Sequence, residues 1–240
     1  MTESQPWRVL IPVRLMEGEP LARPLIALLE PVDTVVLGYF VTKDQVTPEH
    51  ARNEFGRRAN QVMDDLVAEL ASDGRTVETR LVFTPNYEQS IDRIAKVSNA
   101  NVVLYPGDIE EANRILVATR GRVGTDRMAS FVRALFSDTD CRITFLHVVP
   151  SQSRVEEGEE YLETVVNGIG KSIEGNEKVN RLVEVDRDPL SAILDEADNH
   201  DLLVIGESEE SWRNVLFGNL SDKIRDSTQK PVFVVRQDES

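Results

Sequence analysis

The amino-acid sequence contains two copies of one pattern of apolar and polar segments, and this repeat limits the folds that the chain can adopt. The runs Arg8-Val-Leu-Ile-Pro-Val13 and Arg114-Ile-Leu-Val-Ala-Thr119 are near copies of one another. Each precedes a segment whose apolar residues have helical spacing, at 20–30 and 125–136. Continuous apolar runs of this length are typical of strands that are covered on both faces. Each copy therefore begins with a buried strand and a helix.

The rest of each copy continues the alternation of strands and helices. The sequence predicts these further elements in the two copies: strands at 35–41, 79–83, 101–105, 143–149, 181–185 and 201–205, and helices at 48–72, 88–98, 155–174 and 189–199. Only the second copy continues to a helix at 218–228 and a final strand at 231–235. Strands that alternate with helices imply right-handed crossovers and a parallel sheet.

The repeat predicts an α/β chain of two Rossmann-like units, in which helices flank each parallel sheet. Residues 1–108 form a truncated first repeat that lacks the last loop and the fifth strand. Residues 109–112 form a short acidic linker, and residues 113–240 form the complete second repeat.

Charge and composition exclude several classes of partner. The net charge of −15 would repel nucleic acids and anionic membrane surfaces. No apolar run approaches the roughly 20 residues that span a bilayer, and the N-terminus lacks the features of a signal peptide, so we expect a cytoplasmic protein without membrane insertion. Cys141 is the only cysteine, which excludes an intrachain disulfide, and its apolar surroundings predict a buried thiol.

The stretch at 204–219 combines a phosphate-binding arrangement with an unfavourable charge. A buried strand ends at Gly206, and a second glycine, Gly218, lies at the predicted start of a helix. Such a loop can hold phosphate because glycines allow a close approach and the helix offers free N–H groups. However, three carboxylates, those of Glu207, Glu209 and Glu210, lie between the glycines.

The order of elements resembles the universal stress protein family in its tandem form. The most specific matches are Asp201-Leu-Leu-Val-Ile-Gly206, Leu216-Phe-Gly218, Asp222-Lys-Ile and Lys230-Pro-Val-Phe-Val-Val235. The resemblance implies a sheet order of 3-2-1-4-5 in the complete repeat and 3-2-1-4 in the truncated one. In nucleotide-binding members it implies a Gly-x2-Gly-x9-Gly-Ser/Thr loop after strand 4 and an aspartate at the end of strand 1, near the adenine.

This sequence departs from that pattern at four of five positions. Gly206 matches the first glycine, whereas Glu209 stands at the second and Gly218 reaches the third one residue early. Asn219 replaces the Ser or Thr, and Thr119 stands near the position of the aspartate. We expect a degenerate loop without a cofactor. The alternative is a sensor of ATP or AMP that binds with Mg²⁺ bridging the carboxylates and the phosphates.

No catalytic constellation is evident, and we expect the protein not to be an enzyme. The three histidines occupy a helix start, a strand and a helix end, where packing and capping explain them. The turn at 121–124 could hold an anion between Arg120 and Arg122, with Arg14 at the matching place of the first copy, or its glycines could simply allow a tight turn. The resemblance also argues against ATP pyrophosphatase relatives, because a Ser-Gly-Gly-type loop is missing after the first strand.

The final strand, 231–235, is expected to lie at a sheet edge and to pair. It could join its copy in a homodimer, which we favour, or the bare edge of the first repeat near 102–105. The resemblance further implies a regulatory or interaction module, and a link to a transporter through a protein partner is one form of it.

Overall fold

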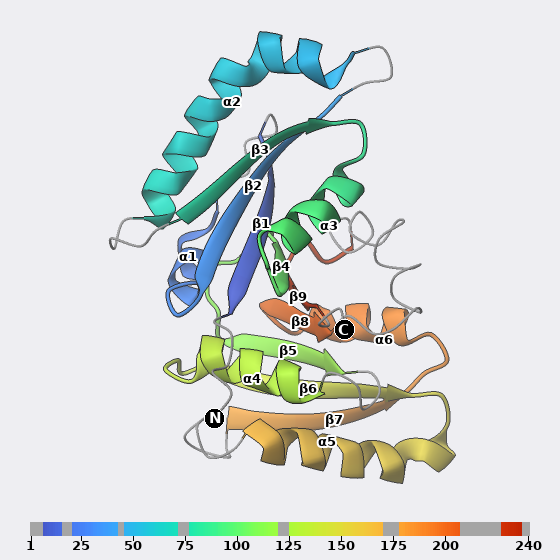
Figure 1. Ribbon diagram of the computed structural model, residues 1–240. Coiled ribbons are helices and arrows are strands. Elements are labelled where there is room, and N and C mark those ends of the chain that lie inside the picture. The colour runs from blue at the N-terminus through green and yellow to red at the C-terminus, as the bar shows by residue number, and fades with distance from the viewer. Residues whose placement is uncertain are drawn as a thin grey trace. The chain divides into compact units, whose positions relative to one another are not determined.

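The computed structural model describes residues 7–15, 21–42, 46–71, 77–119, 125–169, 178–206 and 227–236. The chain divides into two compact units, Met1–Pro106 and Gly107–Ser240 (Figure 1). Each unit has its own parallel sheet, and the two are described in turn.

The first unit contains four parallel strands. They are β1 (Arg8–Arg14), β2 (Asp33–Val41), β3 (Val77–Thr84) and β4 (Val102–Tyr105). Within this unit the order is β3-β2-β1-β4, which confirms the predicted order 3-2-1-4. The centre of β1 is completely buried, with Val9, Leu10 and Ile11 at 0% exposure. A run of this kind forms a central strand because both of its faces are covered.

Helices lie on both faces of this sheet. They are α1 (Arg23–Leu28), α2 (Pro48–Leu70) and α3 (Tyr87–Val97). Ile91 and Ile94 of α3 pack against Leu10 and Val35. On the opposite face, Gly38 leaves room for α2, since a Cβ built there would lie 2.4 Å from the Met63 sulfur. Alternation along β2 thus directs neighbouring residues to different helices.

The second unit contains five parallel strands. They are β5 (Arg114–Thr119), β6 (Arg142–Val149), β7 (Val179–Val185), β8 (Leu202–Gly206) and β9 (Val232–Val235). Within the unit the order is β9-β8-β5-β6-β7, which confirms the predicted order 3-2-1-4-5. Its core includes Phe131 and Phe233, whose ring centroids lie 5.6 Å apart.

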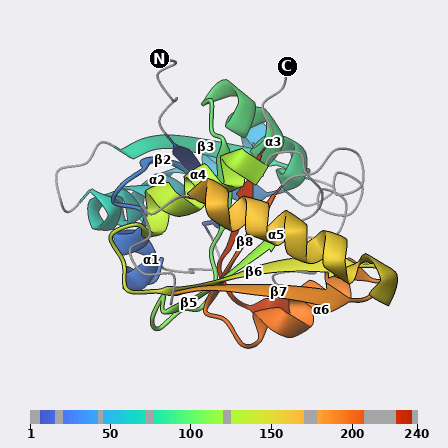
Figure 2. The ribbon, with the colours of Figure 1, turned by 90° about the horizontal axis from the view of Figure 1, so that it is seen from below.

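The helices of the second unit also lie on both faces of the sheet. They are α4 (Thr125–Phe136), α5 (Val155–Ile169) and α6 (Pro189–Ala197), with a 3₁₀ turn, η1 (Gln152–Arg154), before α5. Figure 2 shows α4 and α5 on one face and α6 on the other. Gly158 of α5 meets β6 and β7 closely, because a Cβ there would lie 3.0 Å from Val183 Cγ1 and 3.2 Å from Val149 Cγ1.

The predicted elements that fall on described residues are found, with two differences. The helix predicted at 20–30 begins at Arg23 and ends at Leu28, because Pro24 favours a helix start and Pro31 cannot continue the helix. The turn η1 was not predicted, and α5 is described only to Ile169. Most of the helix predicted at 218–228 lies outside the described residues.

Candidate functional site

The carboxyl ends of β5, β6 and β8 bring together two of the predicted site residues and one histidine. In the strand register Thr119 lies opposite His147, and Ala118 lies opposite Ile205, which places Gly206 at the same edge. Ligands of open α/β sheets gather at this edge, where adjacent strands lead to opposite faces. The predicted positions Glu209, Gly218 and Asn219 lie outside the described residues, as do Arg120 and the turn at 121–124.

Thr119 bonds to the neighbouring strand through both of its polar oxygens. Its hydroxyl donates a hydrogen bond to the Leu146 carbonyl at 3.1 Å, and its own carbonyl lies 3.0 Å from Nδ1 of His147. The residue is 5% exposed. A carboxylate at this position could accept two hydrogen bonds from a nucleotide base. The threonine hydroxyl instead donates its hydrogen to a carbonyl within the sheet. Thr119 therefore ties β5 to β6 rather than presenting a charged acceptor.

Gly206 lies against an apolar side chain of α4. A Cβ built at Gly206 would lie 2.5 Å from Cε of Met128, and Met128 is itself buried. The glycine gives this thioether room at the end of β8. Because a methionine terminus is flexible, this contact is adaptable.

His147 is the residue of this edge that sequence reasoning treated only as packing. Its ring lies half-buried, 4.6 Å from the ring of Tyr161. Since the Thr119 carbonyl can only accept, Nδ1 carries the proton in the neutral ring and Nε2 does not. Burial lowers the pKa of His147, and the Thr119 hydrogen bond and the Glu157 carboxylate oppose this effect. The imidazole is therefore neutral at pH 7.

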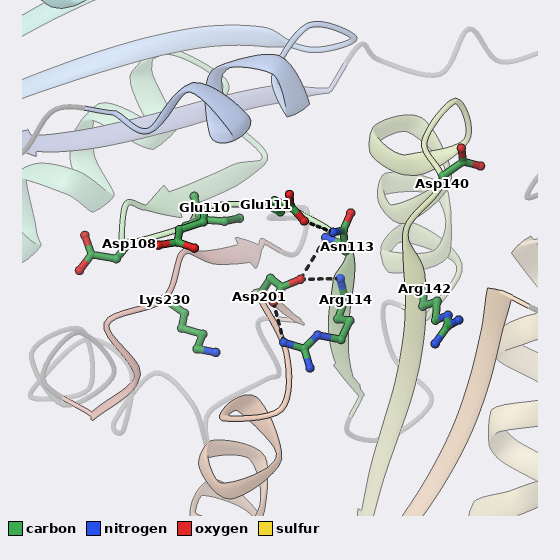
Figure 3. A pocket seen from close by; sticks show the side chains of 10 residues that line it. Asp108, Glu110, Glu111, Asn113, Arg114, Asp140, Arg142, Asp201 and Lys230 are labelled. Carbon is green, nitrogen blue, oxygen red and sulfur yellow. Dashed lines mark hydrogen bonds and ion pairs between the residues drawn. The ribbon is translucent and has the colours of Figure 1, made fainter.

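The described residues of the second unit also line a cavity of about 680 Å³ at the opposite, amino edge of the sheet (Figure 3). The linker 109–112 supplies three of the lining residues, and residues at or near strand starts supply most of the others. The lining consists of Asp108, Ile109, Glu110, Glu111, Asn113, Arg114, Asp140, Arg142, Asp201 and Lys230. Each of the strands β5, β6, β8 and β9 has a charged residue at its start or within two residues before it. These charged residues are the sequence signal for the cavity, and the sequence analysis did not predict a site from them.

Asp201 is the centre of the polar contacts in this cavity. Its carboxylate accepts hydrogen bonds from the backbone N–H groups of Asn113 (3.0 Å) and Arg114 (2.8 Å), and from the Arg114 guanidinium (3.1 Å). Burial alone would raise the pKa of Asp201, but these hydrogen bonds outweigh it and the pKa lies below its usual value. The carboxylate fixes the point at which the linker enters β5.

One further cation and one further carboxylate of the cavity have structural partners. Lys230 donates to the carbonyls of His200 and, at 3.3 Å, Asp198, so it caps the C-terminal end of α6. Asp140, on the far side, pairs with Lys178 at 2.6 Å. Five carboxylates and three cations line the cavity, and two of the cations, Arg114 and Lys230, are engaged, so the cavity is unsuited to a polyphosphate. The residues that correspond to a nucleotide site, Thr119 and Gly206, lie at the carboxyl edge instead.

In the described ranges, no group of three or more His, Cys, Asp or Glu side chains could hold a metal ion. Within those same ranges, no helix has the length and apolar character needed to cross a bilayer.

Comparisons with known proteins give one consistent family. A sequence profile of the universal stress protein family matches residues 111–236. A universal stress protein from Archaeoglobus fulgidus is similar over 97% of this chain and 97% of its own, with 16% identity and a TM-score of 0.63. A protein from Pseudomonas aeruginosa, provisionally named a universal stress protein, is similar over 97% and 94%, with 15% identity and a TM-score of 0.54. At these identities the similar structures show a shared fold alone. A search of curated proteins gives no significant match.

Proposed function

Because the chain belongs to the universal stress protein family, we propose that it is a cytoplasmic, non-enzymatic regulatory or interaction module that does not bind ATP. The single observation that carries this proposal is the state of Thr119. The resemblance implies an aspartate near this position. The chain has Thr119 instead, and its hydroxyl donates a hydrogen bond to the Leu146 carbonyl inside the sheet.

The charge of the loop after Gly206 supports the same proposal. Glu207, Glu209 and Glu210 follow the strand directly in the sequence. One carboxylate about 5 Å from a phosphate costs on the order of 3 kcal/mol at an effective dielectric constant near 20. A helix N-terminus returns about 0.3–2 kcal/mol. Two such glutamates outweigh the helix contribution unless a divalent cation lies between them and the phosphate.

Calorimetric titration of the full chain with Mg-ATP tests the proposal. We expect no binding tighter than about 100 μM, which corresponds to roughly −5.5 kcal/mol. Tighter binding by the unaltered chain would refute the proposal. The variant E207Q/E209G/E210Q should bind ATP more tightly than the unaltered chain, because the repulsion is removed.

A matched control separates the local charge from the total charge. The variant E156Q/E159Q/E163Q removes three exposed carboxylates from α5 and leaves the loop intact. It should leave ATP affinity unchanged. Equal gains in both variants would mean that net charge, and not the loop, limits the binding of nucleotide.

The alternative function is a Mg²⁺-dependent sensor of ATP or AMP. It is favoured by the position of Gly206, which lies at the carboxyl edge beside Thr119, where a phosphate loop of this fold begins. This sensor would bind nucleotide with Mg²⁺ and lose it in EDTA, whereas the interaction module would give no heat in either buffer.

The proposed partner is a second copy of the chain, joined through strand 231–235. Among the described residues of the second unit, β8 is the one strand that pairs with β9, and an apolar strand edge favours further pairing. Light scattering after size exclusion should give twice the chain mass at micromolar concentration, and a monomer would count against the homodimer.

A link to a transporter through a protein partner is the form of interaction that the family resemblance implies. It predicts sedimentation of the protein with native membranes. Protease treatment of those membranes should abolish the effect, since the contact is with a protein.

A further inference from the structure

The contact between α5 and the ends of β5 and β6 depends on one histidine that the proposed function does not use. His147 donates from Nδ1 to the Thr119 carbonyl, 3.0 Å away, and its ring packs against Tyr161. The same ring borders Gly158, since a Cβ there would lie 3.3 Å from His147 Cδ2. The imidazole is thus enclosed by α5 on one side and the strand end on the other.

Among the described residues, the charged groups around the ring come from η1 and the start of α5. The described groups that face the ring are the Thr119 carbonyl from β5, uncharged Val183 from β7, and Arg154, Glu157 and Tyr161 from η1 and α5. Arg154 and Glu157 form a bidentate pair, with Nε–Oε2 at 2.9 Å and Nη2–Oε1 at 2.7 Å. The Glu157 carboxylate, which favours a charged ring, is therefore already paired with the Arg154 guanidinium.

We propose that His147 is an acid-sensitive contact that holds the first turns of α5 against the carboxyl edge of the sheet, and that its protonation loosens them. A proton on Nε2 places a charge in a half-buried position and creates a second donor. The Thr119 carbonyl already accepts from Nδ1. The new donor on the imidazolium can bond to the Glu157 carboxylate only by competing with Arg154. It can bond to water instead if α5 moves away from the sheet.

The direction of the effect follows from linkage. The pKa of His147 is lowered in the folded protein, so the neutral ring contributes stability that is present above the unfolded pKa of about 6.5 and is lost as the pH falls towards the folded pKa. Each unit by which the two pKa values differ changes the opening equilibrium by up to about tenfold. The device would therefore respond to acidification below the unfolded pKa of about 6.5.

Hydrogen–deuterium exchange on the full chain tests the proposal, with protection in Val155–Ile169 corrected for the intrinsic effect of pH on exchange. In the unaltered chain, protection of the first turns should fall several-fold from pH 7.5 to pH 5.5. The variant His147→Asn keeps an N–H near the Nδ1 position but cannot be protonated, so its protection should change by less than about twofold. Equal losses in both proteins would overturn the proposal.

Two further variants keep the test decisive. His200→Asn removes the other described histidine of the second unit, which bonds to the Glu196 carbonyl at 2.9 Å, and should leave the response of α5 intact. Glu157→Gln leaves His147 in place but removes the carboxylate that favours the imidazolium, so NMR of the ring should show a lower titration midpoint. An unchanged or higher midpoint in Glu157→Gln, or a lost response in His200→Asn, would also overturn the proposal.

Discussion

Gly158 offers a sharp test of how closely α5 approaches the sheet. Replacing a helical glycine with alanine normally stabilises a protein by about 1 kcal/mol, because glycine has greater backbone freedom when unfolded. At Gly158 the new methyl group would lie 3.0 Å from Val183 Cγ1, 3.2 Å from Val149 Cγ1 and 3.3 Å from His147 Cδ2. All three distances are shorter than ordinary carbon–carbon contacts of about 3.5–4.0 Å.

The neighbours of Gly158 cannot easily move aside. Two are valines, whose branched side chains have one strongly preferred rotamer, and His147 is bonded to Thr119. Overpacking of this kind costs about 1–3 kcal/mol. After the gain of about 1 kcal/mol in helix propensity, Gly158→Ala should destabilise the protein by up to about 2 kcal/mol. Gly158→Val should destabilise it further.

Gly168 of the same helix is the matched control. A Cβ at Gly168 would meet only Asp126 Oδ1, at 3.9 Å, which is an ordinary contact. Gly168→Ala should therefore stabilise the protein by about 0.5–1 kcal/mol. The free energy of unfolding in urea, followed by circular dichroism, should separate the two variants by about 0.5–3 kcal/mol. If Gly158→Ala stabilises the protein as much as Gly168→Ala, α5 does not pack as closely as described.

Three further predictions concern single residues. Asp201→Asn should lower the free energy of unfolding at pH 7 by about 1–2 kcal/mol. The folded pKa of Asp201 is lowered, so its stabilisation is present above its unfolded pKa of about 3.9 and is lost as the pH falls through the folded value. Urea denaturation should therefore show the variant and the unaltered chain converging as the pH is lowered below about 3.9. Burial raises the pKa of Cys141, which is 3% exposed, so its reaction with a thiol reagent at pH 8 should be at least about 100-fold slower than in urea, and equal rates would contradict the burial. Gln229 has φ near 50°, so Gln229→Gly should raise the melting temperature by about 1–3 °C, whereas a decrease would mean that its side chain stabilises the turn.

The sequence by itself determined the type and order of the elements. Continuous apolar runs identified β1, β5 and β8, and helical spacing identified α4 at its observed bounds, because burial on a face requires a matching period in the sequence. The family resemblance supplied the order of the strands. It also placed Thr119 and Gly206 at one edge, since the carboxyl ends of parallel strands meet there.

Only the tertiary structure decided which polar atoms are engaged. The bond from Thr119 to Leu146 joins residues 27 positions apart, and the bonds from Asp201 to Asn113 and Arg114 span 88 and 87 positions. Periodicity shows that a residue faces a neighbouring strand or helix, but not which atom it meets. That partner depends on the register between distant strands and on how closely a helix such as α5 packs, and both are set by the packing of the whole unit.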